Sequence, residues 1–110
     1  MLLSAFAITL AFSTFGQTKV YVANQLTNDI TIIDADNNTV VGTLAPFNMP
    51  SNLAFTPDGA KGVITFAGSG SASIIDPTDP FNFTNLTCGA GASDVVISPD
   101  GQKAYIGNAS

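Results

Sequence analysis

Few residues of this chain have side chains that could do chemistry, and their spacing favours structural roles. All eight acidic residues are aspartate, and there is no histidine, glutamate or arginine. The segment 34–38 (Asp-Ala-Asp-Asn-Asn) carries oxygen ligands at alternate positions, as the first half of a calcium loop does. Thr39 stands where that loop needs glycine, and Ala45 where it needs its final acid. We interpret the segment as an Asx-rich turn, with calcium binding as the alternative.

Cys88 is the only cysteine, so no disulfide can form within the sequence. It is interpreted as a small buried hydrophobe, or as half of a disulfide with a cysteine outside these residues. A catalytic thiolate is disfavoured because no histidine is present to activate it. The sequence therefore predicts no catalytic residue, no cofactor site and no metal site in this segment.

The three lysines show how the chain is organised. Lys19, Lys61 and Lys103 follow one another at intervals of 42 residues. The same step carries Asp34 onto Asp76 and one Pro-Asp-Gly triplet onto a second. A fixed period of this length is typical of repeat architectures, in which each repeat is one supersecondary unit.

Each repeat contains short segments rich in Val, Ile, Thr, Tyr and Phe, bounded by Asn, Asp, Gly and Pro, which predict strands. No sustained helical stripe occurs outside the N-terminal apolar run. Four strands per unit at this period predict an all-β fold built from β-propeller blades of four antiparallel strands. The expected strands lie at 19–24, 29–34, 39–44, 52–56, 62–66, 71–76, 83–87, 94–98 and 103–108.

Two Pro-Asp-Gly triplets predict tight hairpins between successive strands. Proline presets φ at the first turn position, aspartate caps the local backbone, and glycine takes positive φ. We therefore assign the triplets a structural role and do not interpret their aspartates as catalytic acids. The six residues are Pro57, Asp58, Gly59, Pro99, Asp100 and Gly101.

The segments 19–24 (Lys-Val-Tyr-Val-Ala-Asn), 30–34 (Ile-Thr-Ile-Ile-Asp), 39–44 and 50–59 (Pro-Ser-Asn-Leu-Ala-Phe-Thr-Pro-Asp-Gly) together resemble the YVTN-type β-propeller repeat of surface-layer-type propellers. The motif that names this family reads Tyr-Val-Ala-Asn here, with alanine in the threonine position. It is weakened to Val-Ile-Thr-Phe in the second unit and returns as Tyr-Ile-Gly-Asn in the third. The resemblance covers residues 19–110.

The resemblance implies a ring of usually seven blades, in which the Pro-Asp-Gly hairpin joins the innermost strand to the second strand. Residues 19–44 then form the outer strands of a first blade, 51–87 a complete blade, and 94–110 the start of a third. About two and a quarter blades would leave apolar faces uncovered. We therefore expect an N-terminal fragment whose faces are covered by the remaining blades of the same chain, with several chains closing one ring as the alternative.

Residues 1–16 are interpreted as a signal peptide. The stretch from Leu2 to Phe15 is almost continuously apolar but too short to span a bilayer comfortably, although no lysine or arginine precedes it. We expect a cleaved signal and export to the periplasm, the extracellular space or the cell surface, with no membrane span after cleavage. An uncleaved anchor, a buried strand and a misplaced gene start are the alternatives.

The formal net charge of −5 and the three scattered lysines disfavour nucleic acid as a partner. The first hypothesis for function is an exported binding or surface scaffold for an unknown protein, glycan or small-molecule ligand. The second is the N-terminal part of an exported propeller enzyme with lactonase-like or redox and cofactor-binding chemistry, since fold alone does not decide between them. Absence of His, Glu and Arg favours the scaffold. Propeller geometry places the expected ligand contacts in loops at the ends of the channel strands, at Asn48, Ser51, Asn52, Ser93 and Asp94.

Overall fold

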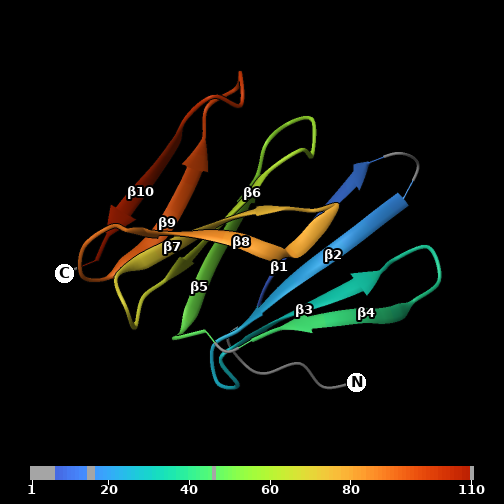
Figure 1. Ribbon diagram of the computed structural model, residues 1–110, viewed down its shortest axis with the longest axis horizontal. Helices are drawn as coiled ribbons and strands as arrows, with labels where there is room; N and C mark the ends of the chain where they lie inside the picture. Colours follow the sequence, from blue (N-terminus) through green and yellow to red (C-terminus); the bar gives the residue numbers. More distant parts are fainter. Residues whose placement is uncertain (1–6, 15–16, 46, 110) are drawn as a thin grey trace.

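The computed structural model describes residues 7–14, 17–45 and 47–109, and these form strands and turns without a helix (Figure 1). The all-β prediction is confirmed. The strands are β1 (Ala7–Thr14), β2 (Gln17–Asn24), β3 (Asp29–Asp34), β4 (Thr39–Leu44), β5 (Pro50–Phe55), β6 (Gly62–Phe66), β7 (Ser71–Asp76), β8 (Asp79–Thr87), β9 (Ala92–Ile97) and β10 (Ala104–Asn108).

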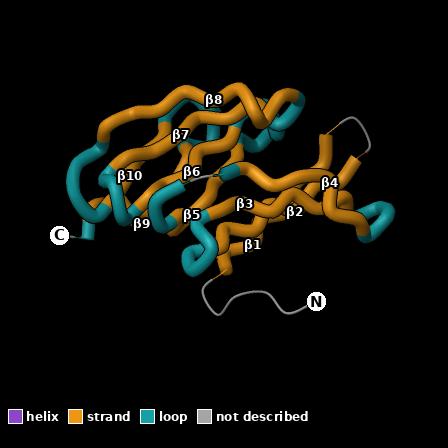
Figure 2. The backbone as a smooth tube through the Cα atoms, turned by 60° about the horizontal axis from the view of Figure 1, so that its bottom comes forward, coloured by secondary structure: helices purple, strands orange, loops and turns teal. Residues whose placement is uncertain are grey.

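These strands form two four-stranded sheets and one hairpin. β1 to β4 pair in sequence order as the first sheet, β5 to β8 as the second, and β9 with β10 as the hairpin, all antiparallel. The three units follow one another across the molecule, with β5 to β8 in the middle (Figure 1). Each unit is therefore one blade or part of a blade, and the blades stack face against face (Figure 2).

The pairing register repeats with the sequence. Phe55 faces Gly62 in the second sheet, and 42 residues further on Ile97 faces Ala104 in the hairpin. Both strand pairs also skip one residue, Ser51 in β5 and its repeat counterpart in β9. A one-residue bulge bends the strand and redirects side chains, so the two inner strands carry the same bend at the same repeat position.

β1 differs from the inner strands of the other units. It pairs with β2 along its whole length, so the first sheet has four strands where the sequence predicted outer strands only. Leu53 of β5 faces Ile64, and the repeat would place Ala11 opposite Val22, but Thr9 lies there instead. The register of β1 is thus displaced by two residues and has no bulge.

This strand occupies the segment interpreted above as a signal peptide. Of residues 1–16, positions 1–6 and 15–16 lie outside the described part of the chain, and 7–14 form the strand that pairs with β2. The tight Pro-Asp-Gly hairpin that fixes register in the other units has no counterpart before β2, since Thr14-Phe15-Gly16 stands in place of Thr56-Pro57-Asp58. Export and cleavage remain a prediction.

The core lies between the blades. One cluster joins the first sheet to the second and includes Tyr21, Ile30, Ile64 and Ile75, each at most 1% exposed. Burial of such an aliphatic side chain contributes about 1.5–3 kcal/mol. A second, smaller cluster joins the second sheet to the β9–β10 hairpin. β6 is buried at every position because both of its faces are covered.

Aromatic rings close the interface between the first two sheets. Tyr21 meets Phe55 edge to face, with ring centroids 5.0 Å apart. Phe47 stacks on Phe66 at 4.7 Å and also contacts Phe83 at 5.5 Å. These ring contacts contribute stability beyond the burial of apolar area. Through Phe47 they also hold the loop between β4 and β5 against the second blade.

Candidate functional site

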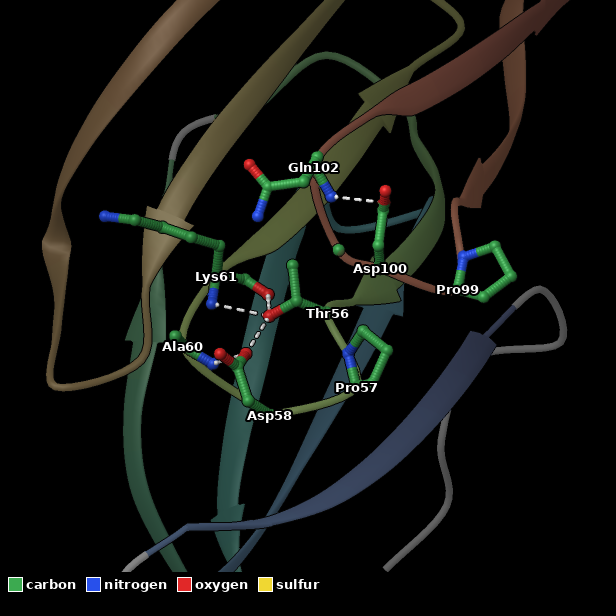
Figure 3. A pocket seen from close by; sticks show the side chains of 9 residues that line it. Thr56, Pro57, Asp58, Ala60, Lys61, Pro99, Asp100 and Gln102 are labelled. Atoms are coloured by element: carbon green, nitrogen blue, oxygen red, sulfur yellow. Dashed lines mark hydrogen bonds between the residues drawn. The ribbon is translucent and has the colours of Figure 1, made fainter.

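The first Pro-Asp-Gly hairpin is held by its own side chains (Figure 3). The Asp58 carboxylate accepts hydrogen bonds from the Thr56 hydroxyl at 2.7 Å and the Ala60 amide at 3.0 Å. Gly59 has φ of 72°, and its amide donates to the Thr56 carbonyl. These bonds, the Ala60 amide first, lower the pKa of Asp58 below its usual value.

The second hairpin repeats this arrangement. The Asp100 carboxylate accepts from the Ser98 hydroxyl at 2.6 Å and from the Gln102 amide at 3.0 Å. Gly101 takes φ of 74°, and its amide donates to the Ser98 carbonyl. The Ser98 hydroxyl is the main cause of the lowered pKa of Asp100. Both aspartates therefore accept hydrogen bonds within their own turns.

A groove lies between the two hairpins, at the end of the blades where they project. Its polar part is a cavity of about 290 Å³, shown in Figure 3. A second cavity of about 280 Å³ continues between the second sheet and the β9–β10 hairpin. The two cavities share Thr56, Lys61, Gly101 and Gln102 and so form one groove. The sequence alone gives no sign of this groove, because its walls come from two successive repeats.

At the opposite end of β5, the bulged serine is part of the scaffold. Ser51 is 8% exposed, and its hydroxyl lies 3.0 Å from the Thr65 hydroxyl and 3.2 Å from the carbonyl oxygens of Thr65 and Ala92. The Thr65 hydroxyl donates to the Ser93 carbonyl at 2.8 Å. These bonds, here called the inter-blade hydrogen-bond cluster, join the second blade to the third.

The other expected ligand contacts lie nearer to solvent. The Asn52 amide and the Asp94 carboxylate occupy the same repeat position on neighbouring blades and lie 3.5 Å apart. The Ser93 hydroxyl donates to the Gly107 carbonyl at 3.3 Å. Asn48 accepts a bond from the Gly68 amide through its carbonyl. The structure thus brings Ser51, Ser93, Asn52 and Asp94 to one end of two adjacent inner strands, while Ser51 itself is buried.

The Asx-rich segment is a closed turn. The Asp34 carboxylate accepts from the Asn37 side chain at 3.1 Å and from the Asp36 amide at 2.9 Å, and Lys19 lies 3.5 Å away. The Asn37 amide group is the main cause of the lowered pKa of Asp34. Asp36 in turn accepts from the Thr18 amide. Among the described residues, no group of three His, Cys, Asp or Glu side chains is placed to hold a metal ion.

Cys88 is half-buried beside the smaller core cluster, and its sulfur lies 3.8 Å from the Leu86 carbonyl. The Asn108 side chain donates to the Cys88 carbonyl at 3.0 Å. Asn24, at the same repeat position, instead donates within its own blade, to Asp29 at 2.8 Å. Asn24 and Asn108 therefore each hold an adjacent segment by a side-chain hydrogen bond.

Tyr21 is the one titratable side chain among the described residues of the larger core cluster. Burial, and then the negative charge of Asp76, raise the pKa of Tyr21 to about 12. Its phenol therefore stays neutral at physiological pH, and the residue acts as an aromatic core side chain.

The blade sheets, their stacking and the groove between hairpins define a β-propeller-type fold. A scan against protein-family models and a search of curated proteins found no match. Among solved structures, the chain is similar to Kuenenia stuttgartiensis hydrazine synthase, with 32% identity and a TM-score of 0.76 over 82% of this chain and 26% of that one.

A second similar structure is dihydro-heme d1 dehydrogenase NirN in complex with DHE. It has 18% identity and a TM-score of 0.71 over 82% of this chain and 19% of the other. Both are β-propeller proteins, so the likeness confirms the propeller-type fold. The chain spans about a quarter and a fifth of their lengths, and their activities belong to them.

None of the described residues lies in a helix that is long and apolar enough to cross a membrane.

Proposed function

We propose that this chain is part of a YVTN-type β-propeller that acts outside the cytoplasm as a binding or surface scaffold. One observation carries the proposal. The polar side chains of Asn52 and Asp94 stand at equivalent positions on adjacent inner strands, 3.5 Å apart, above a hydrogen-bonded base. Two such side chains on successive blades form a suitable surface for recognising a polar ligand.

The surrounding chemistry favours binding over catalysis. The titratable groups with lowered pKa values are aspartates that accept hydrogen bonds within their own turns. A general base needs a pKa near the working pH and a free approach to substrate. The described residues thus supply ligand contacts and a rigid framework. The open face of β9 and β10, where Val96 and Tyr105 are 65% and 60% exposed, is proposed to be covered by the remaining blades of the same chain.

The experiment is a binding screen on the protein isolated from its source organism. A glycan array and a small-molecule thermal-shift panel would be repeated with Asn52→Ala and Asp94→Ala, and with Asn82→Ala as a control on the outer strand β8. The proposal predicts that any ligand found loses affinity in the first two variants and not in the control. A ligand unaffected by both changes would overturn the assigned surface.

The second candidate is a propeller domain of an exported enzyme with redox or cofactor-binding chemistry. The two similar structures, hydrazine synthase and dihydro-heme d1 dehydrogenase, favour it because both are named as enzymes. Reading the coding DNA beyond Ser110 distinguishes the candidates. Further 42-residue units with histidines or a haem-attachment Cys-x-x-Cys-His motif favour the enzyme, and units without them favour the scaffold.

Export has its own test. The intact mass of the protein recovered from the producing cells shows whether the residues preceding Gln17 are removed. A mass that corresponds to a chain beginning near Gln17 supports a cleaved signal. The two-residue displacement of β1 is consistent with cleavage, because β1 does not follow the pairing register of the repeat. A mass that includes Met1 or Leu2 would support β1 as a permanent strand.

A further inference from the structure

The groove between the second and third blades has an apolar wall and a polar mouth. The apolar cavity is lined by Val63, Ile74 and Ile97, and Lys61 and Lys103 flank it. Val63 is 6% exposed and belongs to the smaller core cluster, against which the two isoleucines pack. A cavity of about 280 Å³ lies near the lower end of the range of small-molecule sites. It therefore suits a small ligand with a hydrocarbon part.

The charged side chains at this cavity favour a negatively charged ligand. Lys19, at the same repeat position in the first blade, is held by Asp34 with both side chains less than 20% exposed. Lys61 lies 3.9 Å from Asp76 in a pair that is 56% and 42% exposed, so solvent screens their attraction. Lys103 forms no ion pair within the part of the chain that the structure describes. The solvent-screened ammonium group of Lys61 and that of Lys103 thus flank the cavity.

The nearby carboxylates do not cancel this preference. Asp58 and Asp100 line the polar cavity but not the apolar one. Each also accepts hydrogen bonds from its own turn, which hold the carboxylate against that turn. The apolar cavity therefore has cationic side chains only, with the Gln102 amide as a further neutral donor.

We propose that this groove is a binding site for a short-chain aliphatic carboxylate. The hydrocarbon chain packs on Val63, Ile74 and Ile97, and the carboxylate lies between the ammonium groups of Lys61 and Lys103. The site is independent of the scaffold surface proposed above, because it lies at the opposite end of β5, about 13 Å away at 3.3 Å per strand residue. Failure of either proposal leaves the other standing.

The test is an NMR titration of the full chain with acetate, butanoate and hexanoate, and with hexylamine as the cationic probe. Each buried methylene contributes a constant increment of transfer free energy, so affinity should rise about fourfold per methylene. Chemical shifts should change at Val63, Ile97 and Ala104. Hexylamine should bind at least tenfold more weakly than hexanoate.

Substitutions at two positions test separately the contribution of charge to binding and the need for an open cavity. Lys103→Gln should weaken hexanoate binding about threefold, as loss of an exposed charge contact does, whereas Lys19→Gln removes the same charge far from the groove and should have no effect. Ala104→Trp, at an exposed position on the rim, should fill the cavity and abolish binding with an unchanged melting temperature. Equal binding of the amine, no dependence on chain length, or an unaffected Ala104→Trp variant would each overturn the proposal.

Discussion

Replacing Ser51 by alanine removes the hydroxyl at the centre of the inter-blade hydrogen-bond cluster. The side chain is 8% exposed and nearly isosteric with alanine, so no cavity of consequence forms. The hydroxyl carries one proton and lies 3.2 Å from the Ala92 carbonyl, which belongs to the third blade. The change removes one buried hydrogen bond and leaves an acceptor without that donor.

The expected cost is roughly 1–3 kcal/mol of unfolding free energy, the usual range for an acceptor left unsatisfied on burial. For a chain of this size that corresponds to a fall in melting temperature of about 10 °C. Thermal unfolding followed by far-UV circular dichroism measures it. Ser69→Ala is the matched control, because the Ser69 hydroxyl bonds to the Ser71 hydroxyl in an exposed turn. It should cost less than about 0.5 kcal/mol.

A double-mutant cycle tests the assignment of the energy to this contact. Thr65→Val removes the second hydroxyl of the cluster, which lies 3.0 Å from that of Ser51. The two changes should be non-additive by about 1 kcal/mol, as expected for groups in one hydrogen-bond network. If Ser51→Ala costs no more than Ser69→Ala, or the two changes simply add, the hydroxyls do not join the blades and the reasoning is wrong.

Three further predictions follow from the packing and the charges. Hydrogen bonds lower the pKa of Asp58 in the folded protein. The stability that this carboxylate contributes is therefore present above its ordinary pKa of 3.8 and is lost as the pH falls through its lower folded pKa. Urea midpoints measured between pH 6 and pH 2 should fall less steeply in Asp58→Asn than in the unchanged protein. The pKa of Tyr21 is raised to about 12, so the stability that its neutral phenol contributes is present below pH 10 and is lost as the pH rises toward 12. Absorbance at 295 nm should show this phenol ionising only together with alkaline unfolding. Gly62→Ala would place a Cβ 2.5 Å from a ring carbon of Phe55, whereas a Cβ in Gly107→Ala would lie 3.7 Å from its nearest neighbour. Chemical denaturation should show that Gly62→Ala destabilises the protein by about 1–3 kcal/mol and Gly107→Ala by much less.

The repeat determines much of this structure without help from tertiary contacts. Alternating apolar residues in segments such as Asp29–Asp34 produce strands whose side chains reach opposite faces. The Pro-Asp-Gly triplets close hairpins through bonds within five residues, so their geometry is local. The positions of most strands, the Pro-Asp-Gly hairpins and the equal register of the β5–β6 and β9–β10 pairs follow from such local preferences.

The candidate sites were harder to predict, because they depend on which repeats become neighbours. Ser51 was expected in a ligand loop, but the bulge turns its hydroxyl toward the third blade, where it lies in the inter-blade cluster. Its hydrogen bond to the Ala92 carbonyl could not be predicted from the repeat, because Ala92 lies on an inner strand of the next blade. The groove of Lys61 and Lys103 likewise exists only where two hairpins meet.

The sequence by itself therefore determined the all-β class, the 42-residue blade unit and the turn residues, because strand alternation and turn chemistry act over a few neighbouring residues. Tertiary structure alone decided which serine is buried, which lysine lacks a partner among the described residues, and the two-residue displacement of β1. Stacking of one blade on the next creates these features, and no short-range rule encodes a contact between residues about 42 positions apart.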